Sequence, residues 1–244
     1  MSSSRPIVSI VIPVWNHANE IMACLRSIDA QTYRPLEVTI VDDGSTDHLF
    51  DLMANLRLTV PHRFIQLGGN HGASAARNAG VKDLIGEYLL FVDADIVLHP
   101  DAIEKMVLAL EHSNVTFAYS SFRVGWKKFR NYPFDAEKLR KRPYIHTTSL
   151  MRRTAFTGFD ESLKKFQDWD LWLTIVERGG TGVWIDEELF EITVSKQRES
   201  FQLSKWFPRF VYSLPWWLIG WMPKNLKKYR YWEKIVKEKH GISS

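Results

Sequence analysis

Short apolar runs alternate with helical stretches along the first half of the chain, and this alternation constrains the fold more than any other feature. Four runs rich in β-branched residues are predicted to be buried strands: Ile7–Ile12, Leu36–Val41, His62–Leu67 and Tyr88–Val92. A helical pattern follows each of them, at residues 18–30, 48–58, 73–81 and 102–111. This spacing predicts an α/β fold with a right-handed, mostly parallel central sheet and helices on both faces.

Three segments that are candidates for ligand binding follow predicted strands at the point where each strand ends. They are Pro13–Asn16, Asp42–Asp43 and Asp93–Asp95. Because ligands bind beyond the carboxyl ends of parallel strands, we expect these segments to meet in one crevice. Carboxylates in such a crevice suit a divalent cation, whose preferred ligands are oxygens. A solvated turn, or a cap for the helix near Pro100, is the structural alternative for the Asp-x-Asp pair.

Two other enzyme classes place similar residues differently. Haloacid-dehalogenase-like phosphatases carry Asp-x-Asp after the first strand of their core, whereas here the pair follows the fourth strand. A dinucleotide-binding dehydrogenase needs Gly-x-Gly-x-x-Gly after its first strand. Here Pro13–Asn16 occupies that position, and the glycines at 68, 69 and 72 follow the third strand. The order of the motifs therefore disfavours both classes.

The second half of the chain is less regular. Further strands are predicted at residues 115–122, 144–151, 183–185 and 189–194. A helix is predicted at Asp168–Arg178, and its opening Asp168 could simply cap the first turn. Trp169 and Trp172 could instead shelter this carboxylate and raise its pKa toward the range of a general base.

Five segments are each a weak indication of a protein family, but together they are a highly specific one. They are Val8–Asn16, Val41–Asp47, Asn70–Gly80, Phe91–Asp95 and Gly158–Trp172. Through them, over about residues 6–195, the chain resembles the family 2 glycosyltransferases, which have the A-type glycosyltransferase fold (GT-A). The resemblance implies a GT-A nucleotide-sugar-binding domain at residues 1–197. Its donor half would span about 1–113 and its acceptor half about 114–197.

The resemblance also implies a donor site in the first half. The residues that it places there are Pro13, Trp15, Asp43, Arg77, Asp93 and Ala94. Pro13 and Trp15 would border the nucleotide base, and Asp43 would contact the base or the ribose. Arg77 would lie near the donor, although a helix arginine in a local ion pair is the simpler alternative. Asp93 would lie near the ribose or behind the metal.

The chemistry follows from the same resemblance. Asp95 would ligate Mn²⁺ or Mg²⁺ on the diphosphate of a nucleoside-diphosphate sugar, with a UDP-sugar as the favoured donor. Asp168 would be the catalytic base, and the reaction would invert the anomeric centre. Gln167, where Glu is usual, and Trp15, where Tyr is common, depart from the family pattern. A non-catalytic nucleotide-sugar-binding or scaffolding protein of the same fold is the alternative.

Charge is segregated along the chain. Residues 1–122 have 8 basic and 14 acidic side chains, 123–153 have 10 and 2, 154–197 have 4 and 9, and 198–244 have 10 and 3. The last block is an amphipathic basic and aromatic tail, predicted to be helical over 200–240. Its tryptophans and lysines at 206–240 suit an anionic membrane surface, and packing on the domain is the alternative. Nucleic-acid binding is disfavoured because the donor-site residues point to another chemistry.

The remaining features concern location and single residues. Cys24 is the one cysteine, so no disulfide framework forms, and a small buried hydrophobe is its expected role. No signal-peptide pattern and no run of 18 apolar residues occurs. We therefore expect a cytoplasmic protein, or one attached to the cytoplasmic face of a membrane, that meets a glycan or lipid-linked acceptor. His146 is expected to be a structural or surface histidine rather than an acceptor or metal contact.

Overall fold

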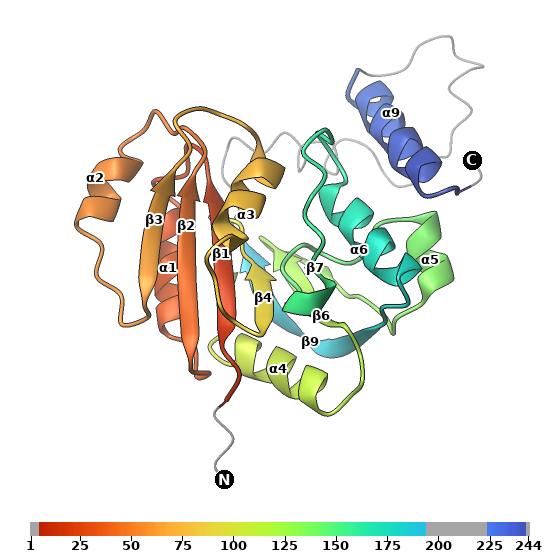
Figure 1. The fold of residues 1–244 in the computed structure, drawn as a ribbon, viewed down its shortest axis with the longest axis horizontal. Coiled ribbons are helices and arrows are strands. Elements are labelled where there is room, and N and C mark those ends of the chain that lie inside the picture. The colour runs from red at the N-terminus through yellow and green to blue at the C-terminus, as the bar shows by residue number, and fades with distance from the viewer. Residues whose placement is uncertain (1–4, 194–223, 243–244) are drawn as a thin grey trace.

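The computed structural model describes residues 5–193 and 224–242 of the 244-residue chain. Within them, nine strands form one sheet in the order β3-β2-β1-β4-β8-β6-β9-β5, with β7 paired to β6 (Figure 1). The strands of the first half are β1 Val8–Val14, β2 Leu36–Asp42, β3 His62–Gln66, β4 Tyr88–Phe91 and β5 Ile96–Leu98. The helices of this half are α1 Ile21–Asp29, α2 Leu49–Ala54, α3 Ala73–Val81 and α4 Ala102–Glu111. The predicted alternation is confirmed.

The second half adds shorter elements to the same sheet. Its strands are β6 Phe117–Val124, β7 Lys127–Phe129, β8 Leu150–Arg152 and β9 Gly182–Ile192. Its helices are α5 Ala136–Lys141, a short 3-10 turn at Arg153–Ala155, α6 Gln167–Glu177 and α9 Lys224–Lys239. The α/β fold class and the C-terminal helical part are therefore as predicted.

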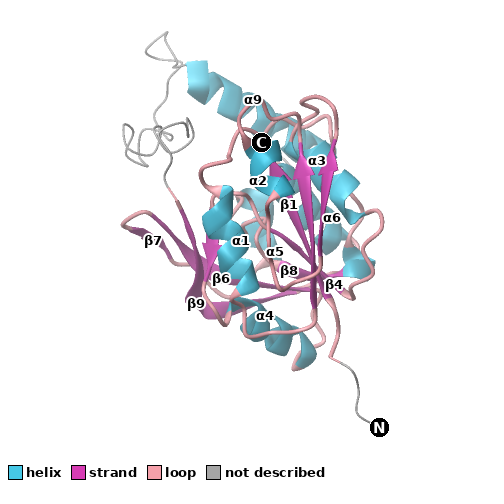
Figure 2. Cartoon of the chain, turned by 90° about the vertical axis from the view of Figure 1, so that its left-hand side faces the viewer, coloured by secondary structure: helices cyan, strands magenta, loops and turns pink. Residues whose placement is uncertain are grey.

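The sheet is parallel in its first half and mixed in its second. β1 pairs in parallel with β2 and β4, and β2 with β3. β8 then joins β4 and β6 in antiparallel fashion, while β6 and β9 run parallel. Figure 2 shows β6, β7 and β9 turned away from the parallel strands, so the sheet curls. The parallel part brings three strand ends to one edge, which positions the site.

Two predicted strands of the second half differ in the structure. The strands expected at 183–185 and 189–194 are one strand, β9, because β6 pairs with residues on both sides of Asp186 and Glu187. These two residues are unpaired and form a bulge where the register shifts. The strand expected at 144–151 is confined to β8, because residues 147–149 form a tight turn. β7 was not predicted, since its sequence is basic and lacks an alternating apolar face.

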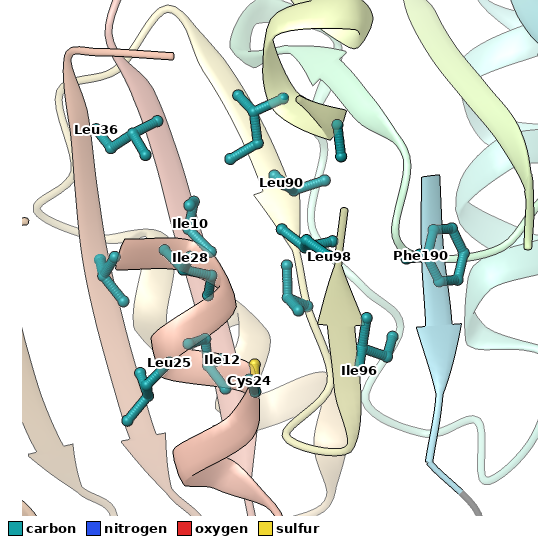
Figure 3. Packing of buried hydrophobic residues seen from close by; sticks show 14 of the residues in the cluster. Ile10, Ile12, Cys24, Leu25, Ile28, Leu36, Leu90, Ile96, Leu98 and Phe190 are labelled. Atoms are coloured by element: carbon teal, nitrogen blue, oxygen red, sulfur yellow. The ribbon is translucent and has the colours of Figure 1, made fainter. Parts of the chain in front are cut away.

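Apolar side chains pack on both faces of the sheet. Ile10 and Ile12 of β1 belong to the cluster that α1, α2 and α4 cover. Figure 3 shows this layer, with Leu25 and Ile28 of α1 over the sheet. Val11 points to the opposite face, where α3, α5, α6 and α9 contribute the second cluster. Strand alternation thus yields two cores, one on each side.

The C-terminal helix α9 packs on the domain. Its Val236 is fully buried in the cluster that includes α6, and its Leu226 is 4% exposed. Residues 194–223, with Trp206, Trp216, Trp217 and Trp221, lie outside the described residues, as does the predicted boundary at 197. Among the helices that are described, none is long and apolar enough to cross a bilayer.

Candidate functional site

A cleft of about 360 Å³ opens at the carboxyl ends of β1, β2 and β4. Its lining includes every residue that the sequence placed at the donor or the metal: Pro13, Trp15, Asp43, Arg77, Asp93, Ala94 and Asp95. Val14, His17, Asn70, Gly72 and Ala73 complete the lining. The strand ends therefore converge as the topology requires, and loops that are far apart in sequence share one cavity.

The loop after β1 is fastened to the loop after β2. Asn16 adopts a left-handed backbone (φ 55°), its amide N–H donates to Ser45 Oγ at 3.0 Å, and its Oδ1 accepts from the Thr46 amide at 2.8 Å. The Ala18 amide donates to Asp47 Oδ2 at 2.9 Å. These hydrogen bonds fix the chain directly after Trp15, which lines the cleft with half of its surface exposed. An indole presented in this way can stack on a planar ligand.

Asp43 organises the glycine-rich loop. Its Oδ1 accepts from the His71 amide at 2.7 Å and its Oδ2 from the Gly72 amide at 2.8 Å. Gly44, with φ +78°, lets the two loops touch, because a Cβ there would lie 2.6 Å from the carbonyl carbon of Gly69. Each carboxylate oxygen keeps a second lone pair, so Asp43 can also face a ligand. The loop-holding role was not foreseen from the sequence.

Arg77 and Asp93 form an ion pair inside the cleft. Arg77 Nη2 lies 2.6 Å from Asp93 Oδ1, and the arginine is 6% exposed. The guanidinium also lies over the Phe159 ring, 5.2 Å from its centroid. The pair joins α3 to the loop after β4, so it is not the local helix pair that was the alternative. Arg77 thus places positive charge in a cleft that is rich in carboxylates.

Asp95 lies at the floor of the cleft and is 3% exposed. Its carbonyl accepts from the amide and the hydroxyl of Thr193, both at 2.8 Å, which fixes the turn that carries it. In residues 5–193 and 224–242, no group of three or more His, Cys, Asp or Glu side chains could hold a metal by itself. A cation that takes most of its ligands from a diphosphate and water needs only one or two carboxylates, so Asp95 fits that kind of site.

Cys24 lies beneath this turn. Its Sγ is 3.7 Å from the Asp93 carbonyl oxygen, and its side chain is fully buried. Burial, together with the charges of Asp95 and Asp93, raises the pKa of the thiol far above its usual range. The expected role as a buried hydrophobe is confirmed.

Asp168 does not line the main cleft. It lies in a second hollow of about 160 Å³, whose other lining residues are Phe122, Pro143, Tyr144, Ile145 and His146. The N-cap position of α6 is Phe166, which makes no side-chain cap, and Asp168 Oδ1 accepts from the adjacent Trp169 amide at 2.9 Å. Burial raises the pKa of Asp168, against the opposing effects of that hydrogen bond and of the Arg77 charge. The carboxylate is thus a better base than a surface aspartate.

His146 faces the same hollow. Its Nδ1 accepts from the Thr148 amide at 3.0 Å, and its ring contacts Phe122 and Phe190 with centroids 5.2 and 5.1 Å away. The histidine is held in place by packing, as expected for a structural one. It also lies beside Asp168, which no local sequence pattern indicated.

Comparison with known proteins identifies the family and the fold. The glycosyl transferase family 2 model matches residues 9–165. A glycosyltransferase of Rickettsia felis is 29% identical over 206 residues, which cover 80% of this chain and 34% of that protein. S. aureus TarS 1–349 in complex with UDP-GlcNAc has a TM-score of 0.67 at 19% identity, over 84% of this chain and 63% of that one.

A second solved structure has the same fold. The mannosyltransferase PcManGT from Pyrobaculum calidifontis, in complex with GDP-Man and Mn²⁺, has a TM-score of 0.66 at 20% identity, covering 80% of this chain and 59% of that one. The chain spans about a third of the length of the R. felis relative. The family match covers well over half of the chain, and the chain belongs to glycosyl transferase family 2.

Proposed function

We propose that this protein transfers a sugar from a nucleoside-diphosphate donor to an acceptor hydroxyl and inverts the anomeric centre. The observation that carries the proposal is the single cleft at the ends of β1, β2 and β4, which gathers Trp15, Asp43, Arg77 and Asp95. A UDP-sugar is the favoured donor. Solved structures of TarS are complexes with UDP and with UDP-GlcNAc, and that of PcManGT is a complex with GDP-Man and Mn²⁺. A donor screen therefore has to include both UDP-sugars and GDP-sugars.

The donor would lie across the cleft with its base toward β1. The exposed indole of Trp15 and the ring of Pro13 offer apolar surface for the base. Asp43 keeps lone pairs that can accept from the base or from a ribose hydroxyl. Asp93 and Ala94 come next along the cleft toward the ribose. The guanidinium of Arg77 offsets part of the carboxylate charge that a diphosphate would otherwise meet.

A divalent cation fits at Asp95. The carboxylate lines the cleft next to Asp93, and oxygen ligands suit Mg²⁺ or Mn²⁺. When bound there, the cation would neutralise charge that develops on the leaving nucleoside diphosphate. The hydrogen bonds of Thr193 to the Asp95 carbonyl keep this turn in place as the ligand binds.

Asp168 would accept the proton of the attacking hydroxyl. Its hollow is separate from the donor cleft, yet the charges of Arg77 and Asp93 act on its pKa, so the two sites are neighbours. An acceptor held at Phe122 and Tyr144 would reach the sugar from the side opposite the diphosphate. Attack from that side inverts the configuration and needs no protein nucleophile. A base next to the donor also favours an enzyme over a non-catalytic sugar-nucleotide-binding protein.

The acceptor class follows from the tail. A polysaccharide, a lipid-linked glycan or a cell-surface glycoconjugate precursor on the cytoplasmic face of a membrane is the proposed acceptor. The apolar side of α9 is used in packing, but Lys227, Lys228, Arg230 and Lys234 are exposed. Each basic side chain near an anionic surface contributes about 1 kcal/mol. α9 would therefore add electrostatic attraction, and residues 206–223 would have to supply any apolar insertion.

Two substitutions test the proposal against a screen of UDP-, GDP- and dTDP-sugars with Mn²⁺ or Mg²⁺. Asp168→Asn keeps the size of the side chain but removes the base, so transfer should fall by about 10²–10⁴-fold while donor affinity stays near normal. Asp95→Asn should abolish the cation-dependent part of donor affinity in titration calorimetry. Asp101→Asn, an exposed acid paired with Lys105, is the matched control and should change neither. Parental transfer by Asp168→Asn would exclude this base.

A further inference from the structure

The residue that ends the C-terminal helix lies between two carboxylates of α6. His240 Nε2 is 2.9 Å from Asp170 Oδ1, and its Nδ1 is 2.9 Å from Glu177 Oε2. The His240 side chain is 3% exposed and that of Asp170 is 5% exposed. The adjacent Lys239 reaches Asp170 at 2.8 Å and Asp160 at 2.6 Å. This cluster is remote in sequence from every motif that defines the family site.

The contacts of the ring limit the protonation states that the histidine can have. Ionised carboxylates only accept hydrogen bonds, and a neutral imidazole has a single N–H to donate. Two ring nitrogens that both lie 2.9 Å from carboxylate oxygens therefore need either an imidazolium or a protonated carboxyl beside a neutral ring. Neighbouring cations favour ionised carboxylates, and therefore the imidazolium. Lys239 contacts Asp170, and Arg140 of α5 lies 4.0 Å from Glu177.

The cluster also contacts the segment that carries the proposed base. Asp170 follows Asp168 by two residues in the first turn of α6. Asp160 lies in the loop that leads into α6, next to Phe159, whose ring contacts Arg77 in the donor cleft. Figure 1 shows α9 beside α6. α9 therefore holds the segment that carries the base at two points.

We propose that His240 is a positioning residue for Asp168: as an imidazolium between Asp170 and Glu177, it fastens the C-terminal helix to the base-bearing helix. Docking of α9 then takes up a proton at any pH at which the undocked imidazole is neutral. The catalytic part of this inference rests on the proposed role of Asp168 as the base. The structural part, proton-linked docking, stands on the hydrogen-bond geometry alone.

The direction of the pH dependence follows from the groups around the ring. Burial lowers the pKa of His240, but the hydrogen bonds and charges of Asp170 and Glu177 outweigh it and raise the pKa above its ordinary value of 6.5. The contribution to docking is fully present below the unfolded pKa and is lost as pH rises through the raised folded pKa. The contact with Lys239, which lowers the pKa of Asp160 to about 2, persists across this range.

Two variants distinguish the need for a proton on His240 from the need for its hydrogen bonds to α6. His240→Ala removes both hydrogen bonds. Glu177→Gln replaces one carboxylate with an amide that can donate to Nδ1 of a neutral ring, while Nε2–H still donates to Asp170. Docking in this variant should no longer need the proton. Lys234→Ala is the matched control on α9, because Lys234 is exposed and its Nζ lies 3.5 Å from Glu238 of the same helix.

Hydrogen exchange by mass spectrometry of the full chain measures docking, as protection factors of residues 226–240 between pH 6 and 10. Parent and Lys234→Ala should lose protection as pH rises. His240→Ala should lose at least about tenfold at pH 6, as expected for charged hydrogen bonds. Glu177→Gln should stay protected at high pH. Protection of α9 that depends on neither pH nor His240 would overturn proton-linked docking.

Sugar transfer measures positioning. In His240→Ala, kcat should fall by about 10–100-fold, the effect of a small misplacement of a catalytic group, while KM for the donor stays unchanged. If His240→Ala loses protection of α9 but keeps the kcat of the parent, the contact between His240 and α6 does not position Asp168. That result would overturn the positioning role. If the parent transfers no sugar from any donor, the proposed function fails, and the positioning role fails with it. The exchange data would still decide whether docking is proton-linked.

Discussion

Replacing Arg77 by methionine should change both the stability of the protein and the pH dependence of catalysis. Methionine fills most of the space of the arginine stem, so the lost interaction is mainly the 2.6 Å ion pair with Asp93. Exposed pairs are worth about 0–1 kcal/mol, and removing one partner of a fully buried pair costs about 3–5 kcal/mol. The Asp93 side chain is 28% exposed, which allows water to solvate it after the substitution. We expect an intermediate loss of about 1–3 kcal/mol.

Thermal denaturation is the first assay. For a chain of this size, 1 kcal/mol corresponds to about 2–4 °C in Tm, so Arg77→Met should melt about 2–12 °C lower. Arg130→Met is the matched control, because Arg130 pairs with Asp186 at the surface, with 74% and 53% of the two side chains exposed. The control should melt with the parent. A double variant, Arg77→Met with Asp93→Asn, should recover part of the loss, because no uncompensated carboxylate is left.

The pH profile of transfer is the second assay. Asp168 must be ionised to act as a base, and the Arg77 charge lowers its pKa. Removing that charge should raise the pKa of Asp168 and move the acidic limb of kcat/KM to higher pH. The same limb should stay in place in Arg130→Met. If Arg77→Met melts with the parent and leaves the acidic limb unchanged, Arg77 does not have the electrostatic role deduced here.

Three further predictions concern the loops, the thiol and the tail. Gly44→Ala should cost about 1–3 kcal/mol in thermal denaturation, because a Cβ at φ +78° meets the backbone of Gly69. Cys24 should not react with a thiol reagent at pH 8 in the native protein, and should react fully in denaturant, because burial raises its pKa and blocks access. The full chain should float with anionic liposomes at low salt but not at high salt, and reversing the charges of exposed Lys227 and Lys228 should weaken flotation.

A specific outcome would contradict each of these three predictions. A Gly44→Ala protein as stable as the parent would mean that the loops do not need their close approach. Rapid labelling of native Cys24 would mean that the layer over it opens readily. Flotation that is equal with neutral and anionic vesicles would remove the electrostatic argument for a membrane-borne acceptor.

The donor half could be predicted from the sequence because its information is local. The run that forms β1 is apolar at consecutive positions, as a strand covered on both faces must be, and the helices between the strands show their own period. In a parallel sheet, every strand with a helical crossover points the same way. The residues after β1, β2 and β4 then have to meet, and Trp15, Asp43 and Asp95 line one cleft.

The tertiary structure decided what depends on pairing across long stretches of chain. β9 is continuous, although Asp186 and Glu187 interrupt its apolar pattern, because β6 pairs on either side of the bulge. Asp168 lies in a separate hollow because residues 143–146, and Phe122 of β6, form its walls. Nothing within a few residues of Asp168 specifies those neighbours.

The C-terminal helix shows the same division. Its periodicity predicts a helix but cannot say which surface it covers, and both a membrane and the domain suit a basic, aromatic sequence. The packing on the domain includes contacts of His240 with Asp170 and Glu177, which lie 70 and 63 residues earlier in the chain. Local sequence sets backbone conformation because its energies come from neighbours within a turn or a pleat. Burial and charge pairing come from residues that meet only in the folded chain, so the structure alone could place them.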